Sequence, residues 1–497
     1  MLAYLGIDIG TFEAKGVLVD ASGRILASAA RRHRMLVPEP GWAEHRPIED
    51  WWAGLREIAA RLLAETRLDP REIRGVGLSA IGPCMLPVDA AGAPLGNAVL
   101  YGVDTRAARE IAELTERIGE ARLIAHGGNR LTAQSVGPKI LWLQRNRPEI
   151  FAAAARVHTA TSFLVERLTG EAVMDHFTAA GFTPLYDATA RRWAAPAGVG
   201  LLEPARLPRL GETTDIAGTI TSEAAAATGL AAGTPVTVGT IDAAAEAFSV
   251  GVTAPGEMML MYGSTIFTIL LTAAPVFDAR LWYAPWLRPG LHASQAGLAT
   301  SGTLTQWFRE HFARELPAET AMARLAEEAA ASPPGAAGLV VLPYFSGERT
   351  PIHDPLARGC FFGLDLTHTR GHLFRAVLEG IACSVRHALS AYAEAPRRVL
   401  VAGGGTRNPV WVQAVSDVCG LEQIVPRETI GASLGDAMLA AFAIGDVDAA
   451  ALADWNPART TVTPRVELAG LYDAQFSLYR RLYEQTKDLM AALPRHG

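Results

Sequence analysis

Three short segments of this 497-residue chain combine glycine with hydroxyl residues directly after apolar runs: Asp8-Ile9-Gly10-Thr11, Gly263-Ser264-Thr265 and Gly403-Gly404-Gly405-Thr406. Small residues let several backbone N–H groups converge on an anion, and the hydroxyl groups add further donors. A single segment of this kind is more often only a tight turn that requires positive φ. Three in one chain, two of them in similar surroundings, favour phosphate binding.

Three aspartates are candidates for chemistry. One lies in the first of these turn segments, and the other two each stand between an apolar run and an expected helix. Asp8 lies in a very apolar run, where a charge is costly unless it holds a cation or caps the turn that follows. Asp242 follows the apolar TPVTVGT and precedes the helical AAAEAFSVG, so it either caps that helix or accepts a proton from a substrate hydroxyl. Asp104, in LYGVDTR, also precedes a helix, and capping alone explains it as well.

The elements that must position these groups are readable from the apolar pattern. YLGIDIG, KGVLVD and RILASAA predict a meander of three strands. GEMMLMYGSTIFTILLT repeats the strand, small-residue turn and strand of the opening segment, which indicates an internal duplication. The sequence therefore predicts two related α/β domains that face one another across a cleft and join near residue 245. A further strand is expected at IRGVGLSA, and helices are expected over 51–65, 373–392, 408–419 and 432–443.

Several other patterns carry less weight. Gly75–Ala80 fits the dinucleotide pattern G-x-G-x-x-A, but its glycines fall within the expected strand. Gly431–Gly435 matches the hydrolase pattern G-x-S-x-G, yet the only later histidine is His496. The chain has no P-loop motif, no H-E-x-x-H and no C-x-x-C pair among its four cysteines. The sequence thus argues against a P-loop enzyme, a zinc site and a disulfide framework.

Composition narrows the function classes further. Charged residues make up 19% and hydrophobic residues 49%, as in ordinary globular proteins, and the net charge is -6. That charge gives no sequence-wide attraction to nucleic acid or to an anionic membrane. The N-terminus lacks a signal-peptide pattern, and no run of eighteen apolar residues occurs. We therefore expect a cytoplasmic protein that binds a small molecule, with neither nucleic acid nor membrane as a partner.

Longer motifs resemble the FGGY family of carbohydrate kinases, in the actin and sugar-kinase superfamily, and most closely its xylulokinase branch. Gly359–Glu379, GCFFGLDLTHTRGHLFRAVLE, meets the second family signature in full, and Lys139–Asn146, KILWLQRN, approaches the first. The resemblance implies two ribonuclease-H-like α/β domains around a central cleft. Residues 1–245 would bind the sugar and carry the catalytic base, and residues 246–497 would bind the nucleotide. It also implies ATP and Mg²⁺ as cofactors, and a homodimer is plausible.

The resemblance also implies roles for individual residues. Asp8 would face the metal and the transferred phosphate, and Asp242 would be the general base and a substrate contact. Asp104 would bind a sugar hydroxyl, and Phe267 would line the substrate pocket. The residues implied to contact ATP are Gly10, Thr11, Gly263, Ser264, Gly302, Gln306, Gly404 and Asn408.

Some positions depart from the xylulokinase pattern. Ile81-Gly82-Pro83-Cys84 stands where a Gln-Met-His-Gly stretch is usual, and Gly102-Val103 replaces the Trp-Asn before Asp104. Ala243 replaces the Asn that usually follows the base. Loss of these polar groups changes which hydroxyls a site can satisfy. Glu13, beside the first turn, would be unfavourable near phosphate unless it points away or meets the metal.

Together these features predict an ATP-dependent kinase that phosphorylates a hydroxyl of a small sugar or polyol, with a ketopentose as the first candidate. The missing pocket groups motivate one alternative, a catalytically weak sensor that binds sugar and nucleotide. Retention of both Asp8 and Asp242 argues against it, because a binding module has no need of both carboxylates. A nucleotide-dependent chaperone or cytoskeletal relative would share the fold, but it does not predict the complete second signature.

Overall fold

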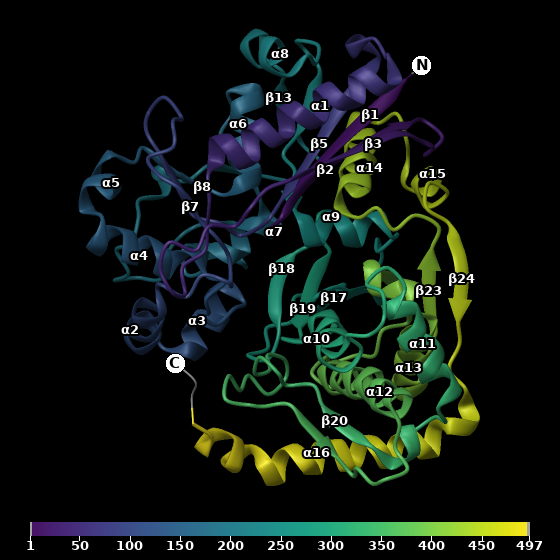
Figure 1. Cartoon of the computed structure of the whole chain (residues 1–497). Coiled ribbons are helices and arrows are strands. Elements are labelled where there is room, and N and C mark those ends of the chain that lie inside the picture. The colour runs from purple at the N-terminus through teal and green to yellow at the C-terminus, as the bar shows by residue number, and fades with distance from the viewer. Residues whose placement is uncertain (1, 495–497) are drawn as a thin grey trace. The chain divides into compact units, whose positions relative to one another are not determined.

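The computed structural model describes residues 2–494, and the chain packs into two compact units (Figure 1). The first unit comprises Met1–Thr253, Leu271–Ala293 and Ile430–Pro457, and the second comprises Ala254–Leu270, Ser294–Thr429 and Ala458–Gly497. Each unit is an α/β body with its own sheet, as the sequence predicts. The bounds 1–245 and 246–497 stay a prediction, because compact packing alone does not define a folding domain.

The first unit is built on a mixed sheet with the strand order β13-β14-β5-β1-β2-β3, and β15 also pairs with β5. The predicted meander is confirmed: β1 pairs antiparallel with β2, β2 pairs antiparallel with β3, and β5 lies parallel to β1. All seven residues of β1 are buried, since helices cover both faces of this central strand. The strands are β1 (Ala3–Ile9), β2 (Glu13–Asp20), β3 (Ile25–Arg32), β5 (Ile73–Ala80), β13 (Ile216–Thr219), β14 (Pro235–Thr237) and β15 (Thr240–Ile241).

Two helices pack on opposite faces of this sheet. α1 (Ala53–Thr66) follows a π-helical turn at Pro47–Trp52, and its Ile58 lies over Gly16 of β2. α14 (Ala432–Ile444) approaches β1 and β5 so closely that glycine is required beneath it. A Cβ atom at Gly6 would lie 1.9 Å from the backbone oxygen of Ser433, and one at Gly77 would lie 1.9 Å from that of Asp436. These glycines let the α14 backbone rest directly on the sheet.

The remaining elements of the first unit surround this sheet. Its other helices are α2 (Ala108–Ile118), α3 (Glu120–Gly127), α4 (Val136–Asn146), α5 (Pro148–Ala153), α6 (Ala160–Thr169), α7 (His176–Ala179), α8 (Ser222–Thr228), α9 (Asp242–Ser249) and α15 (Ala449–Ala453). Short strand pairs are β4 (Glu44–His45) with β7 (Ala98–Val99), β6 (Leu86–Val88) with β8 (Arg156–His158), β9 (Val173–Asp175) with β12 (Arg209–Gly211), and β10 (Tyr186–Asp187) with β11 (Arg192–Trp193). β18 spans Trp282–Pro285.

The second unit repeats the opening pattern of the first. β16 pairs antiparallel with β17 and parallel with β22, as β1 does with β2 and β5, which confirms the predicted strand–turn–strand repeat. Among the strands of this unit, the order is β19-β17-β16-β22-β23-β24. The strands are β16 (Glu257–Tyr262), β17 (Ile266–Thr272), β19 (His292–Gly297), β22 (Arg398–Ala402), β23 (Gln423–Pro426) and β24 (Ala458–Val462), with β20 (Val340–Leu342) and β21 (Cys360–Phe362) as a separate pair.

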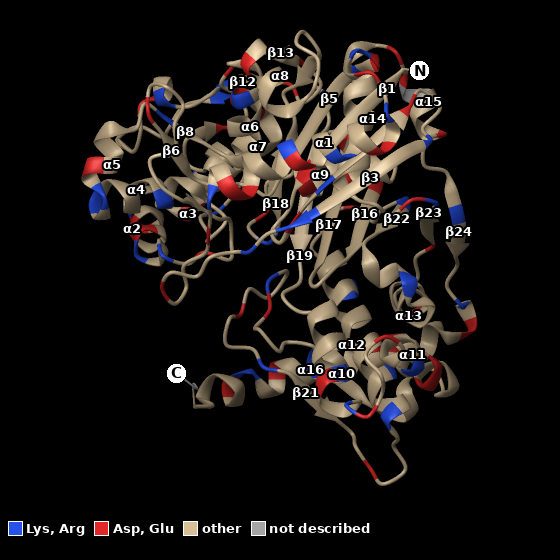
Figure 2. Ribbon diagram, turned by 45° about the horizontal axis from the view of Figure 1, so that its top comes forward, with Lys and Arg blue, Asp and Glu red and all other residues tan. Residues whose placement is uncertain are grey.

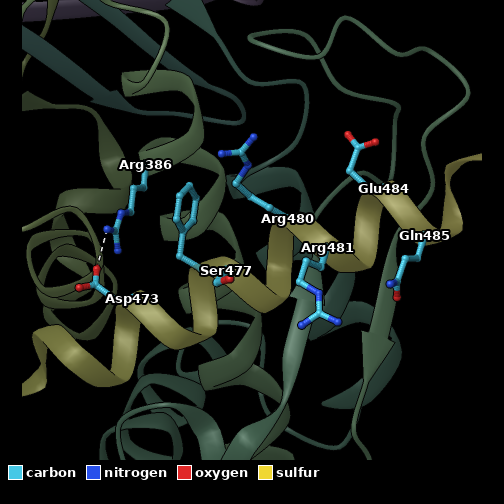
Figure 3. A pocket seen from close by; sticks show the side chains of 8 residues that line it. Arg386, Asp473, Ser477, Arg480, Arg481, Glu484 and Gln485 are labelled. Atoms are coloured by element: carbon cyan, nitrogen blue, oxygen red, sulfur yellow. Dashed lines mark hydrogen bonds and ion pairs between the residues drawn. The ribbon is translucent and has the colours of Figure 1, made fainter.

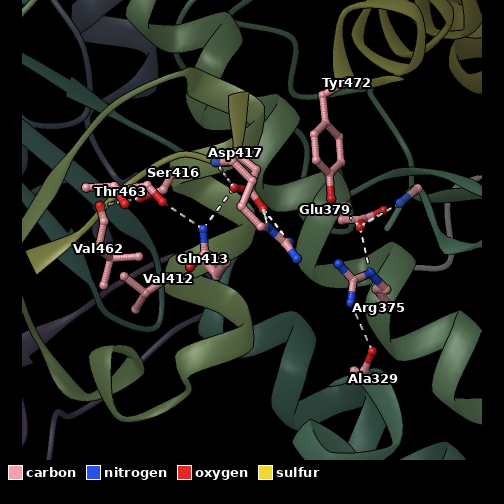
Figure 4. Close-up of polar contacts among 12 residues, drawn as sticks. Ala329, Arg375, Glu379, Val412, Gln413, Ser416, Asp417, Val462, Thr463 and Tyr472 are labelled. Carbon is pink, nitrogen blue, oxygen red and sulfur yellow. Dashed lines mark hydrogen bonds and ion pairs between the residues drawn. The ribbon is translucent and has the colours of Figure 1, made fainter. Parts of the chain in front are cut away.

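Buried polar contacts join the helices of the second unit (Figure 4). Arg375 of α12 donates to Glu379 one turn later, at 2.8 Å, and also to the backbone oxygen of Ala329 on α11. Tyr472 of α16 donates to the same Glu379 carboxylate at 2.9 Å. These contacts fix α11 and α16 against α12. The helices are α10 (Gly302–Phe312), α11 (Ala321–Ala331), α12 (Arg370–Leu389), α13 (Pro409–Cys419) and α16 (Ala469–Ala492).

Acidic and basic residues are interspersed along both units (Figure 2). Within residues 2–494, no helix is both long and apolar enough to cross a bilayer.

Candidate active site

The sheet of the first unit brings the predicted catalytic aspartates together. In the register of the parallel strands, Asp8 of β1 lies beside Ser79 of β5, and Ser79 lies beside Thr240 of β15. Two residues after Thr240 the chain enters α9, whose first residue is Asp242. The Asp242 carboxylate accepts the N–H of Ala243 at 2.8 Å. Asp8 and Asp242 therefore stand at the carboxyl ends of two strands that both pair with β5, and ligands bind at such strand ends in many α/β proteins.

Asp8 and Asp242 belong to a larger group of carboxylates. Ser79 Oγ lies 2.7 Å from Asp436 Oδ2 and 3.2 Å from Asp8 Oδ1, so one hydroxyl joins two acids. Glu246, one turn after Asp242 on α9, adds a fourth carboxylate. Sequence analysis missed Asp436, because it arrives from α14, far along the chain. The only local signal was the small-residue run Gly431–Gly435 that leads into it.

Burial and mutual repulsion raise the pKa values of these acids. Burial raises the pKa of Asp242 to about 6, and burial together with the Asp242 charge raises that of Glu246 to about 7. Burial raises the pKa of Asp8, and the negative charge of Asp242 raises it further. The positive charge of Lys15, which lies opposite Asp8 on β2, lowers it. Burial and the Asp8 charge raise the pKa of Asp436 in the same direction. Crowded buried acids of this kind are typical of functional sites, and a cation would relieve their repulsion.

The first glycine turn lies directly beside Asp8. The Gly10 N–H donates to the Glu13 oxygen at 3.0 Å and closes the turn between β1 and β2. The Glu13 carboxylate lies 3.6 Å from Lys15 Nζ, so this unexpected acid has a cationic partner. Within the described part of the chain, the backbone N–H groups of Thr11 and Phe12 donate to no protein acceptor. These two donors are available to an anion.

The second turn packs against the start of α10 in the second unit. Gly302 N–H donates to the Gly263 oxygen at 3.1 Å, and Thr303 N–H donates to the Ser264 oxygen at 3.0 Å. A Cβ atom at Gly302 would lie 2.4 Å from the Gly263 oxygen, so only glycine permits this approach. Gln306 lies exposed one turn later on the same helix. The structure therefore groups Gly263, Ser264, Gly302 and Gln306.

The third turn lies at the same edge of that sheet. β22 runs parallel to β16 with Ala402 beside Met261, so Gly403 and Gly404 follow one strand where Gly263 follows its neighbour. Gly403 has φ +88°, and Asn408 caps α13 by accepting the N–H of Val410 at 3.1 Å. The second and third glycine turns thus follow the ends of two adjacent parallel strands, β16 and β22.

Asp104 lies in a buried ion-pair cluster. Its carboxylate is 1% exposed and accepts the Ala43 N–H at 2.7 Å and Arg106 Nε at 2.9 Å. Arg106 also donates to Glu44 at 2.8 Å and stacks on Trp42, 4.0 Å from the ring centroid. Asp104 therefore orients Arg106, and its contact with a sugar hydroxyl stays a prediction. Phe267, on β17 of the second unit, is half-buried.

The segment that departs from the xylulokinase pattern is buried in the first unit. Cys84 donates its backbone N–H to Thr159 Oγ1 at 3.0 Å, and burial raises the pKa of its thiol to about 12. Lys139, of the first-signature segment, is 1% exposed and donates to the backbone oxygen of Tyr101 at 3.0 Å. Burial lowers the Lys139 pKa to about 8. The Ile81–Cys84 segment thus offers one buried neutral thiol and no amide or imidazole side chain.

A groove of about 630 Å³ lies along α16, outside the predicted site (Figure 3). Arg386 on its wall is already paired with Asp473 at 2.6 Å and packs over Phe476. No residue predicted to act in catalysis or binding lines it. The lining residues are Arg386, Asp473, Phe476, Ser477, Arg480, Arg481, Glu484 and Gln485.

Comparison of the sequence with models of known families shows which family this chain belongs to. Residues 3–249 match the model of the FGGY carbohydrate-kinase N-terminal domain, and residues 258–444 match that of the C-terminal domain. This chain belongs to the FGGY family of carbohydrate kinases. The FGGY kinase is 29% identical to a xylulose kinase of Bacillus subtilis over 99% of both chains. It is 31% identical to a xylulose kinase of Escherichia coli over 98% of this chain and 100% of that one.

Solved structures agree with this family assignment. The crystal structure of a xylulose kinase from Rhodospirillum rubrum superposes with a TM-score of 0.90 at 32% identity, covering 98% of this chain and 99% of that one. A Plasmodium falciparum glycerol kinase with ADP shares the fold, with a TM-score of 0.88 at 22% identity over 98% of both chains. The ribonuclease-H-like α/β fold of actin and the sugar kinases is thereby confirmed. The FGGY kinase is a phosphotransferase that acts on a carbohydrate, and kinases of this family use ATP.

Proposed function

We propose that this FGGY kinase transfers the γ-phosphoryl group of ATP to a hydroxyl of a ketopentose, with xylulose as the first candidate. The observation that carries the proposal is the pairing of Asp8 and Asp242 beside a glycine turn with two open N–H donors. Similarity to xylulose kinases over almost the whole chain supports the choice of sugar. The sensor alternative gains no support from these relatives.

The residues around Asp8 suit a magnesium–nucleotide complex. Within residues 2–494, no three His, Cys, Asp or Glu side chains are arranged to hold a metal ion by themselves. Mg²⁺ is usually bound by one or two carboxylates together with phosphate oxygens and water, so Asp8 with a bound triphosphate meets that requirement. Bound Mg²⁺ would neutralise charge on the transferred phosphate. It would also offset the repulsion that raises the pKa of Asp8.

Asp242 acts on the acceptor hydroxyl. Phosphoryl transfer passes through a loose transition state, so positioning the hydroxyl matters more than strengthening the nucleophile. The Asp242 carboxylate, held at the start of α9 with a pKa of about 6, is ionised at neutral pH and can accept a hydrogen bond from the hydroxyl. As the new P–O bond forms and the bond to ADP breaks, the hydroxyl proton passes to Asp242.

Other residues hold the two substrates. Gly10 and Thr11 form the first phosphate turn, and Gly263 and Ser264 form the second. Gly302 and Gln306 flank the nucleotide, and Gly404 with Asn408 holds the adenosine. Asp104 and Phe267 contact the sugar. The apolar Ile81–Cys84 and Gly102-Val103 segments offer fewer side-chain hydrogen bonds, so we expect selectivity among pentuloses to rest on Asp104, Arg106 and Asp242. From the family resemblance alone, we propose a homodimer and a cytoplasmic location.

The test replaces Asp242 by asparagine, which keeps the size and the hydrogen bond to Ala243 but removes the base. ADP release is measured with D-xylulose, D-ribulose, L-ribulose, L-xylulose, glycerol and erythritol, and ATP binding is measured by calorimetry. We expect kcat of the best substrate to fall by about 10³-fold, with the ATP Kd changed less than threefold. Near-normal turnover of Asp242→Asn would remove the proposed base. Absence of ADP release from the wild type with every sugar would refute the kinase assignment for this panel.

A matched control separates chemistry from helix capping. Asp448 also stands at the start of a helix of the first unit, where it accepts the Ala451 N–H at 2.8 Å. Asp448→Asn removes the same charge from a helix start, so we expect kcat to stay within twofold of the wild type. Equal losses in Asp448→Asn and Asp242→Asn would show that Asp242 acts only as a cap.

A further inference from the structure

Three consecutive carbonyl groups of the first glycine turn are held by two histidines. The ring nitrogen Nε2 of His33 lies 3.0 Å from the Gly10 oxygen, and Nε2 of His45 lies 3.0 Å from the Thr11 oxygen. The backbone N–H of His33 donates to the Phe12 oxygen at 2.9 Å. A carbonyl oxygen only accepts hydrogen bonds, so each Nε2 carries the proton. The turn is thus fixed through its oxygens, from one side.

A third residue fixes the state of His45. The indole Nε1–H of Trp51 donates to His45 Nδ1 at 3.0 Å, which leaves Nε2 as the protonated nitrogen of a neutral ring. His45 is 0% exposed, and the His33 ring packs edge-on against it with centroids 4.9 Å apart. Burial lowers the pKa of His45 to about 4, so the ring is neutral near pH 7. His45 lies in β4 and His33 follows β3, so both are anchored to strands.

Peptide geometry converts these contacts into a direction for the N–H groups. In a planar trans peptide the C=O of one residue and the N–H of the next point in opposite directions. Carbonyls of Gly10 and Thr11 that face the histidines therefore turn the N–H groups of Thr11 and Phe12 away from them. Those are the two N–H groups that have no protein acceptor among the described residues. The histidines thus leave a pair of open donors on the opposite side of the turn.

We propose that His33 and His45 are positioning residues that keep the Thr11 and Phe12 N–H groups aimed at the terminal phosphate of ATP. The proposal rests on the proposed kinase function. Neither histidine touches the nucleotide, so the effect is preorganisation: without the ring donors, the turn must be ordered when ATP binds. The adenosine contacts belong to the second unit and do not depend on this turn.

The experiment compares ATP with adenosine as ligands of the sugar-free protein. His45→Phe and His33→Phe keep an aromatic ring but remove the Nε2 donor, and His45→Gln restores an N–H donor. The control is His126→Phe, because His126 Nε2 also bonds a backbone oxygen of the first unit, that of Ala194, at 2.7 Å. Calorimetry with Mg²⁺ gives the Kd of ATP and of adenosine, and steady-state kinetics give KM for ATP and for the sugar. Thermal unfolding confirms that each variant is folded.

We expect His45→Phe and His33→Phe to raise the ATP Kd about tenfold, the effect of losing one hydrogen bond of about 1.4 kcal/mol. The adenosine Kd and the sugar KM should change less than twofold, His45→Gln should recover at least half of the lost ATP affinity, and His126→Phe should bind ATP as the wild type does. An unchanged ATP Kd, or equal weakening of ATP and adenosine, would overturn the proposal. A wild type that binds no ATP would instead overturn the proposed function.

Discussion

Replacing Gly77 by alanine tests the close packing that brings Asp436 to the site. A Cβ atom added at Gly77 would lie 1.9 Å from the backbone oxygen of Asp436, whereas ordinary contacts begin at 3.4 Å. The two groups must therefore separate by about 1.5 Å. The Cβ atom is fixed to the main chain of β5, and the oxygen belongs to the main chain of α14, so no side-chain rotation can make room. The whole helix has to move away from the sheet.

The cost follows from this displacement. Overpacking of a core costs about 1–3 kcal/mol, and a clash between backbone atoms belongs at the upper end of that range. For a unit of about 300 residues, whose unfolding entropy is about 2.1 cal/mol/K per residue, about 3 kcal/mol lowers Tm by about 5 °C. The displaced helix would also pull Asp436 away from Ser79, whose hydroxyl lies 2.7 Å from it in the native protein. We therefore expect Gly77→Ala to lose activity as well as stability.

Thermal unfolding followed by circular dichroism measures the effect, with Gly96→Ala as the control. Gly96 has no atom within 4 Å of the added Cβ and no positive φ, so its substitution should change Tm by less than 2 °C. If Gly77→Ala had the same Tm as Gly96→Ala, the close packing of α14 on the sheet would be refuted. A lower Tm with unchanged activity would show that the position of α14 does not govern the site.

Two further predictions concern buried charges. Arg106→Lys keeps the charge but loses the forked contact with Asp104 and the stacking on Trp42. We therefore expect the free energy of unfolding, measured in urea, to fall by about 2 kcal/mol and the sugar KM to rise. An unchanged free energy of unfolding and an unchanged KM would contradict this. Burial raises the pKa of Glu348 in the second unit to about 7. Because this folded-state pKa exceeds the unfolded value of 4.5, the stabilisation is complete below pH 4.5 and is lost as pH rises through 7, in total about 3 kcal/mol. Urea unfolding between pH 4.5 and pH 8 should show this loss in the wild type and a flatter profile in Glu348→Gln, and parallel profiles would refute it.

Local sequence patterns predicted most of the elements. The apolar runs around Asp8 and around Gly263 predicted the two strand–turn–strand units, and the structure has β1–β2 and β16–β17 there. Gly75 and Gly77 were placed within a strand and not in a dinucleotide loop, which is confirmed by β5. Strand and turn patterns are set by neighbours in sequence, so these predictions needed no tertiary information.

The groups that complete the site came from long-range packing. Asp436 joins Asp8 only because Gly6 and Gly77 admit α14 onto β1 and β5, two strands that lie more than 350 residues earlier in the chain. His33 and His45 form no recognisable motif, and their role appears only when β3 and β4 place both rings behind the Gly10 turn.

By itself, the sequence determined the family, the α/β units, the glycine turns and the aspartates Asp8 and Asp242, since each of these depends on residue types at short spacing. Tertiary structure alone decided which distant side chains surround those aspartates and which backbone N–H groups remain open. The reason is physical: burial, pKa and hydrogen-bond partners depend on which segments pack together, and that packing is a property of the whole folded chain.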